Sequence, residues 1–160
     1  MTEPETFHFA DDGAIPNSPL PLLLYRGALP EAVNAAAFEK LFAGHGWGGL
    51  WRDGIYAFHH FHSTAHEVLG IAAGRVRVRL GGPAGQSVEV RAGDAVVIPA
   101  GVGHLNEGAS ADLLVVGGYP KGQRADLRRG DPAEHDRMLR NIATVPLPAR
   151  DPVTGGVIWR

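Results

Sequence analysis

The amino-acid sequence predicts a single all-β domain with one short helix before the main β-region and one near the C-terminus. Twenty-two glycines and twelve prolines in 160 residues indicate many tight turns between short strands. Between residues 55 and 118 the apolar residues recur with the period of two that is typical of β-strands. The length fits one domain, covering residues 1–160, that is able to bury a core.

The first part, residues 1–49, is expected to form an arm and a helix. A short strand is expected at Phe7–Phe9, and the apolar run Leu20–Arg26 predicts a strand packed against the core. Asn34 can cap a helix that ends at Gly44. The apolar face of this helix follows the spacing i, i+3 and i+4 at Phe38, Leu41 and Phe42.

The strands of the main β-region, residues 50–120, are predicted from strict alternation. Arg75–Leu80 alternates arginine with valine or leucine, so the apolar side chains face inward if the arginines face water. Ser87–Arg91 and Ala95–Ile98 follow as further strands, separated by glycine-containing turns. Leu113–Gly118 is apolar throughout, as expected for a strand covered on both faces.

The last part, residues 121–160, is expected to contain a helix followed by an extended tail. Asp131 serves as N-cap, Pro132 occupies the first helical position, and Glu134 completes a capping box. The apolar face of this helix consists of Met138, Leu139 and Ile142. Three later prolines end any helix.

The stretch Gly54–Gly74 holds four of the eight histidines. His60 and His62 are two residues apart in a segment expected to be a strand, so their side chains point to the same face. Glu67 follows on the next strand, and His104 comes after a glycine-rich turn. Neutral imidazoles and a carboxylate are ligands for Mn, Fe, Co, Ni and Zn. These four residues therefore predict a metal site.

Several neighbouring residues have alternative interpretations. His66 lies beside Glu67 in the bend between strands, where the alternation can slip by one residue, so it could replace Glu67 as a ligand. His59 lies between inward positions and is expected to point outward. Trp47 and Trp51 are expected to close one end of the barrel rather than stack on a ligand.

Composition excludes several functions. A net charge of −2 offers no basic face for nucleic acid. The chain has no cysteine, which excludes disulfides, thiolate metal ligands and a cysteine nucleophile. The acidic N-terminus does not resemble a secretory signal, and no apolar run is long enough to cross a membrane, so we expect a cytoplasmic protein without membrane contact.

Two spaced motifs carry a resemblance to a known family. The first is Gly54-x5-His60-x-His62-x4-Glu67-x6-Gly74. It resembles, at every specified position, the first motif of the cupin superfamily.

The second motif is Gly93-x5-Pro99-x-Gly101-x2-His104, which resembles the second cupin motif through its histidine. That motif usually continues with asparagine four residues after the histidine. Here position 108 is glycine, and the nearest asparagine is Asn106. This asparagine normally supports the turn, so the departure affects the local geometry more than the ligand set.

The resemblance implies an antiparallel jelly-roll β-barrel of six to eight strands with a metal near its centre. Carried over by position, the metal ligands are His60, His62, Glu67 and His104. The flanking sequences also resemble small single-domain bacterial cupins of the YjlB-like kind, and cupins of this size commonly form homodimers. We expect the pocket wall to consist of Tyr56, Phe58, Leu69, Ile71 and Ile98.

The resemblance further implies a metal-dependent oxygenase, isomerase or lyase acting on a small oxygenated metabolite. Four protein ligands on an octahedral ion leave two positions for a small-molecule ligand such as an α-hydroxy or α-keto acid, an enediol, or O2 with substrate. The ligand set does not distinguish Mn, Fe, Ni, Cu and Zn. No catalytic residue beyond the ligands is identifiable, so a non-catalytic protein that binds a metal and a small ligand is the alternative.

Overall fold

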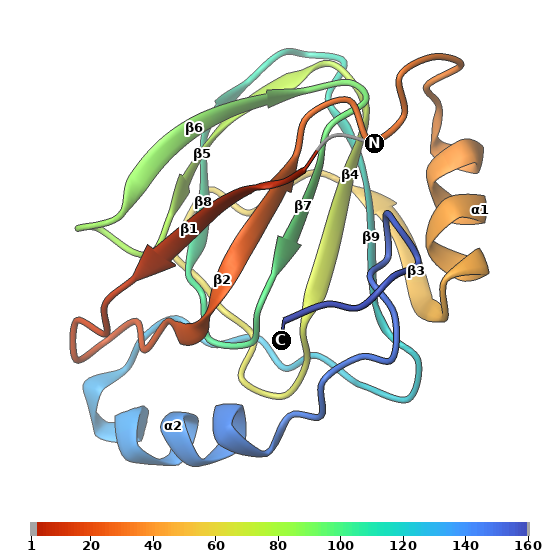
Figure 1. The fold of residues 1–160 in the computed structure, drawn as a ribbon. Helices are drawn as coiled ribbons and strands as arrows, with labels where there is room; N and C mark the ends of the chain where they lie inside the picture. Colours follow the sequence, from red (N-terminus) through yellow and green to blue (C-terminus); the bar gives the residue numbers. More distant parts are fainter. Residues whose placement is uncertain (1–2, 160) are drawn as a thin grey trace.

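The computed structural model describes residues 3–159, so residues 1, 2 and 160 of the predicted domain lie outside the described part. The described chain forms two antiparallel sheets and two α-helices (Figure 1). The strands are β1 (Glu5–Phe9), β2 (Ser18–Tyr25), β3 (Trp47–Asp53), β4 (Glu67–Ala73), β5 (Arg75–Leu80), β6 (Gln86–Arg91), β7 (Ala95–Ile98), β8 (His104–Ala109) and β9 (Leu114–Pro120). None of the described helices has the length and apolar character needed to cross a membrane.

The two sheets face each other and enclose the main core. The larger sheet has the order β1-β2-β7-β4-β9-β3, and the smaller has the order β6-β5-β8. On β5, Val76, Val78 and Leu80 are buried while Arg75 and Arg77 are exposed, which confirms the predicted alternation. The core between the sheets is completed by residues from both of them, including Leu22, Leu24, Ile71, Val90 and Val115.

The N-terminal residues belong to the larger sheet rather than forming a separate arm. β2 pairs with β7, and β1 adds the sheet edge. The barrel therefore begins well before residue 50, the predicted boundary. β1 begins two residues before the predicted strand Phe7–Phe9. The additional residues, Glu5 and Thr6, are polar and exposed, so no apolar pattern indicated them.

The first helix, α1 (Ala35–Gly44), confirms its predicted limits. The Asn34 side chain caps it by accepting a hydrogen bond from the Ala37 amide at 2.8 Å. Phe38 and Phe42 are fully buried against the outer face of the larger sheet. Gly70 of β4 makes this packing possible, because a Cβ there would lie 2.6 Å from the Phe38 ring.

The second helix, α2 (His135–Thr144), follows a 3-10 turn at Pro132–Glu134 and lies across one end of the barrel (Figure 1). Asp131 caps the 3-10 turn by accepting from the Ala133 amide. The predicted capping box is wrong, because the Glu134 carboxylate is drawn into ion pairs with Arg128 and Arg137. Of the predicted apolar face, Met138 is buried, but Leu139 remains 40% exposed.

Residues 54–66 form an irregular segment with two isolated bridges, so the strand predicted to carry His60 and His62 is reduced to those bridges. His60 pairs with His104, and Phe61 pairs with Arg128. The backbone of this segment also bonds at single points, from the Asn106 amide to the Tyr56 carbonyl and from the Gly101 amide to the His62 carbonyl. Side chains hold the predicted bend, where the Ser63 amide donates to Asp126. The His66 amide likewise donates to the side chain of Gln123.

Candidate metal centre

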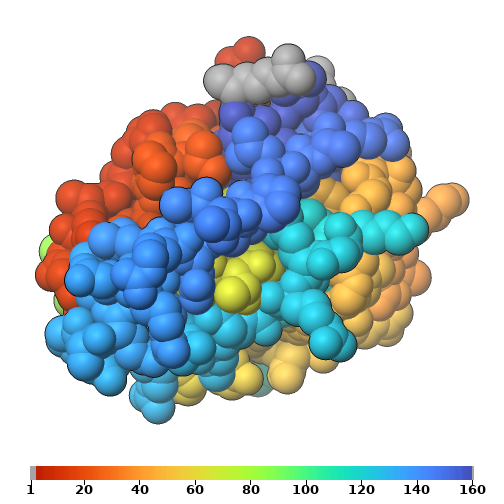
Figure 2. Space-filling model, turned by 90° about the horizontal axis from the view of Figure 1, so that it is seen from below, coloured from red at the N-terminus to blue at the C-terminus, as the bar shows by residue number. Residues whose placement is uncertain are grey.

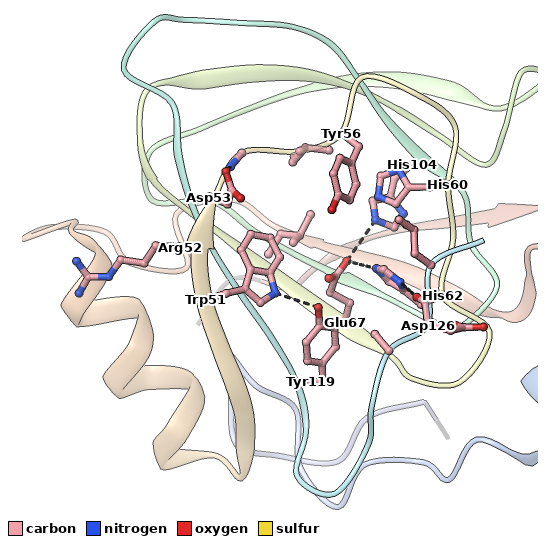
Figure 3. A pocket seen from close by; sticks show the side chains of 15 residues that line it. Trp51, Arg52, Asp53, Tyr56, His60, His62, Glu67, His104, Tyr119 and Asp126 are labelled. Atoms are coloured by element: carbon pink, nitrogen blue, oxygen red, sulfur yellow. Dashed lines mark hydrogen bonds and ion pairs between the residues drawn. The ribbon is translucent and has the colours of Figure 1, made fainter. Parts of the chain in front are cut away.

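Three histidines converge at the end of the barrel where the irregular segment passes β8. His60 and His62 come from residues 54–66, and His104 is the first residue of β8. One ring nitrogen from each lies within 4.8 Å of the others (Figure 3). His60 and His104 are 3% and 1% exposed, so the cluster is screened from bulk water.

Each of these histidines is held by its Nδ1 atom. In His60 and His104, Nδ1 donates to the backbone carbonyl two residues earlier, at 3.0 and 3.1 Å. In His62, Nδ1 donates to the backbone carbonyl of Asp126. When these imidazoles are neutral, their single proton lies on Nδ1 and the Nε2 lone pair is free to bind a metal. Although burial lowers it, the neighbouring Glu67 raises the pKa of His62, so a bound metal would have to displace a proton from His62 Nε2.

Glu67, the first residue of β4, lies beside two of these histidines on the larger sheet, while the group of atoms within 4.8 Å of one another consists of the three histidines. The Glu67 Oε1 atom lies 3.3 Å from His62 Nε2 and 3.2 Å from His104 Nε2 (Figure 3). Burial alone would raise the pKa of this carboxyl, but His62 and His104 outweigh it and hold the pKa well below its usual range. Glu67 is therefore an ionised carboxylate at neutral pH.

These donors fit a transition metal ion. Metal bonds of about 2.0–2.2 Å place adjacent donor atoms roughly 3 Å apart, which matches the spacing around Glu67 Oε1. Burial, together with the neighbouring His104, lowers the pKa of His60 to about 3, so this imidazole is neutral and able to ligate. Imidazole and carboxylate suit Mn, Fe, Ni, Cu and Zn alike.

A cavity of about 450 Å³ opens beside the cluster. Of the five predicted wall residues, Tyr56 and Leu69 line it. Phe58 does not, because it stacks on the side of Tyr56 at a centroid distance of 4.8 Å. Ile71 and Ile98 do not line it either, because they project into the core between the sheets.

Trp51 and Tyr119 are wall residues that the sequence analysis missed. Trp51 lines the cavity and donates from Nε1 to the Tyr119 hydroxyl at 3.0 Å, so its prediction as a barrel plug is wrong. Trp47 is a core residue, with its Nε1 bonded to the Arg150 carbonyl. Gly117, a glycine in an apolar strand, was the available signal, because such a glycine often admits a close neighbour.

Asp126 also lines the cavity, and no sequence pattern indicated it. It belongs to residues 121–131, here called the strap, which pairs with the irregular segment through Phe61 and Arg128. The Asp126 carboxylate accepts from the Ser63 amide at 2.6 Å and also from the Ser63 hydroxyl. The strap thus fixes the backbone next to His62 and supplies the carbonyl that orients its ring.

His66 is not brought to the cluster. Its ring is buried on the opposite side of the chain, where Nδ1 accepts from the Ala100 amide at 2.9 Å and the ring tilts against Trp159. Alternation explains this, since β4 begins at Glu67 and its neighbour faces the other way. His59 is half-buried and also lies outside the cluster.

The departure from the second motif is compensated locally. The side-chain Nδ2 of Asn106 donates to the Ile55 carbonyl at 3.3 Å, and its side-chain oxygen accepts from the Gly108 amide at 2.8 Å. Asn106 therefore joins the start of the irregular segment to β8, two residues before the usual position of an asparagine.

Comparison with known proteins decides the family. A model described as "Cupin domain" matches residues 53–117. The uncharacterized protein YjlB of Bacillus subtilis (strain 168) is 41% identical over 154 residues, which cover 96% of this chain and 92% of YjlB. The chain belongs to the cupin superfamily. The predicted YjlB-like resemblance and jelly-roll barrel are confirmed for this cupin.

Solved structures similar to this cupin include a DUF861 family protein from Thermotoga maritima. It shares 19% identity and a TM-score of 0.35, with coverage of 54% of this chain and 92% of that one. Another is an oxalate decarboxylase from Bacillus subtilis, with 16% identity and a TM-score of 0.41. There the match covers 72% of this chain and 29% of the other. The region matched by the family model contains the histidines and Glu67, but not Trp51, Tyr119 or Asp126 of this cupin.

Proposed function

We propose that this cupin binds one divalent transition metal through His60, His62, Glu67 and His104 and acts as a metal-dependent enzyme. The observation that carries the proposal is the anchoring of three Nδ1 atoms on backbone carbonyls, which turns three Nε2 atoms toward one region. Such outer bonds fix the tautomer and orientation of ligating histidines. Glu67 adds the charge that a divalent cation needs beside neutral imidazoles.

The proposed reaction class is an oxygenation, isomerisation or elimination on a small oxygenated metabolite. The metal would supply Lewis acidity or, for Fe or Cu, oxygen chemistry. The chain's own contribution is a cavity of about 450 Å³, a size that suits a small molecule. The buried cluster strengthens charge interactions with a bound substrate because water is excluded.

Metal content tests the proposal. Protein purified without added metal should contain about one transition metal ion per chain, and anomalous scattering at the metal edges would identify the ion and its protein contacts. His62→Ala should abolish stoichiometric binding. His135→Ala is a matched control, since His135 pairs with Asp11 away from the cluster. Unchanged metal content in His62→Ala would refute the ligand set.

A non-catalytic protein that binds a metal and a small ligand is the second candidate. It is favoured by two titratable groups of the cavity: the Asp126 carboxylate is occupied by Ser63 and Arg128, and the pKa of Tyr119 is raised by burial and by Glu67, which leaves Asp53 as the lining carboxylate outside the cluster without an ion pair among the described contacts. Neither Asp126 nor Tyr119 is a ready general base at neutral pH. Oxygen-uptake and carbonyl-product assays across a metabolite panel distinguish turnover from binding alone.

A homodimer is part of the proposal, supported by the cupin resemblance. Light scattering coupled to size-exclusion chromatography should give twice the mass of one chain. A mass of one chain at micromolar concentration would contradict it.

A further inference from the structure

The cavity beside the metal centre has an unusual distribution of charge. Among the described residues that line it, the only Lys or Arg side chain is Arg52. The Arg52 guanidinium is held outside by Glu39, with contacts of 2.7 and 3.0 Å. The remaining charged lining groups apart from the histidines are the carboxylates Glu67, Asp53 and Asp126. No free cationic side chain of this lining is available to a ligand.

Two arginines of the strap make contacts with other side chains of the protein. Arg129 lies over the face of Phe58, 3.9 Å from the ring centroid. Arg128 is paired with Asp126 and Glu134. Both arginines lie outside the residues that line the cavity.

The wall away from the histidines is aromatic and apolar. Figure 3 shows Trp51 and Tyr119 on one side of Glu67 and the histidines on the other. Ile55 and Leu69 add apolar surface, and Tyr56 stands at the mouth, 54% exposed. Such a wall can cover the body of a ligand whose polar end lies at the metal.

Trp51 also leaves Tyr119 as a hydrogen-bond donor. The indole N–H occupies one acceptor site of the Tyr119 oxygen, so the hydroxyl proton points elsewhere. The wall therefore presents a hydroxyl group beside Glu67 rather than a cation.

We propose that, given the metal centre described above, this cupin selects ligands with a single anionic metal-binding group on an uncharged apolar or aromatic body. Dicarboxylates and phosphate esters are disfavoured. This inference rests on the proposed function and adds a substrate class to it.

Charge balance explains the selection. A divalent ion with Glu67 retains one net positive charge, which one carboxylate of the ligand neutralises. A second carboxylate in the cavity would find no free cation of the lining and would lie near Asp53, whose carboxylate has no cationic partner among the described contacts. An anion that loses water without gaining a partner is rejected strongly.

Two 2-hydroxy acids provide the direct test. Phenyllactate and malate share the same metal-binding group, but the first carries a phenyl ring where the second carries a carboxylate. Calorimetry with metal-loaded protein should show phenyllactate binding at least about tenfold more tightly. Equal affinity, tighter malate binding, or binding of neither acid would overturn the inference. A protein that fails to load metal would instead overturn the proposed function.

A charge-introducing variant sharpens the test. Leu127 lines the cavity mouth and is 45% exposed, so an arginine there can be solvated without disturbing the core. Leu127→Arg should raise malate affinity about tenfold and leave metal content unchanged. Leu147→Arg is the matched control, since Leu147 is 53% exposed but lies outside this cavity. An equal gain in both variants, or none in Leu127→Arg, would contradict the inference.

Discussion

The strand β5 and the irregular segment 54–66 are built on opposite principles. In β5, every residue from Arg75 to Leu80 has a partner on β6, and most have one on β8. In segment 54–66, only His60 and Phe61 make bridges. The regular strand directs its side chains through continuous backbone pairing, whereas the irregular segment has isolated backbone bonds supplemented by side chains from elsewhere.

This difference matches what each region does. A ladder fixes alternation and suits the burial of valines between two sheets. The metal centre needs His60 and His62 at particular angles toward residues from β4 and β8, which simple alternation does not provide. The strap supplies that adjustment through Asp126, 64 residues away from His62 in sequence. Figure 2 shows part of the chain between residues 60 and 70 in a gap bordered by α2 and the segment near residue 120.

The largest expected effect concerns β5. Val76 is fully buried, so Val76→Asp places a carboxylate without a partner between the sheets and should prevent folding. Arg75→Gln, at the adjacent exposed position, should change the free energy of unfolding by less than about 0.5 kcal/mol. Urea unfolding followed by circular dichroism measures both. A folded Val76→Asp protein with near-normal stability would refute the account of β5.

The next effect concerns the strap. Asp126→Ala removes the acceptor of the Ser63 amide and hydroxyl, so the backbone beside His62 loses its support. Metal affinity should fall by up to about tenfold, the lower end of the loss seen when a direct partner of a ligating histidine is removed, because the backbone carbonyl that accepts from His62 Nδ1 is retained. The measurement is a competition titration with a chelator of known affinity.

Asp53→Ala provides the matched control for the strap variant. Asp53 lines the same cavity, but its carboxylate is bonded only to the neighbouring Gly54 amide among the described contacts. Its removal should leave metal affinity unchanged within about a factor of two. If both variants lost affinity equally, a general loss of negative charge would replace positioning as the explanation.

The same contrast explains what the sequence could predict. The limits of α1 and the orientation of β5 follow from local signals, namely the Asn34 cap and the alternation of arginine with valine. The four proposed ligands were found from their spacing, because metal-binding residues leave a pattern in sequence. His66 was a weaker candidate because a one-residue shift in the start of β4 was needed to place it.

The other residues of the cavity could not be predicted from the sequence, because their positions depend on contacts between distant segments. Asp126 and Tyr119 reach the cavity only through the folding of segments far from residues 54–66. Ile71 and Ile98 were assigned to the wall because alternation gives a face but not a depth along the barrel. The proposed metal ligands are therefore indicated by the spacing of nearby residues, whereas the residues of the cavity wall are not.

A third prediction concerns the cavity wall at Trp51, a residue of β3 that pairs with Gly117 of β9. A Cβ at Gly117 would lie 2.0 Å from the Trp51 ring, so Gly117→Ala should displace the indole and break its bond to Tyr119. We expect a loss of about 1–3 kcal/mol in unfolding free energy and a changed tryptophan emission. Gly118→Ala is the control, since its Cβ meets the flexible end of Leu50 and should leave the emission unchanged.

The smallest effect concerns Asn106, whose side chain joins the irregular segment to β8 through two separate hydrogen bonds. Asn106→Ala removes both the donor to the Ile55 carbonyl and the acceptor for the Gly108 amide, and should cost about 1 kcal/mol of unfolding free energy. Asn106→Asp keeps the acceptor but loses the donor. If the contact with Ile55 steadies the irregular segment, Asn106→Asp should weaken metal binding as much as Asn106→Ala while retaining more stability. If the β8 turn matters instead, Asn106→Asp should bind metal normally, because only the Gly108 contact would be needed.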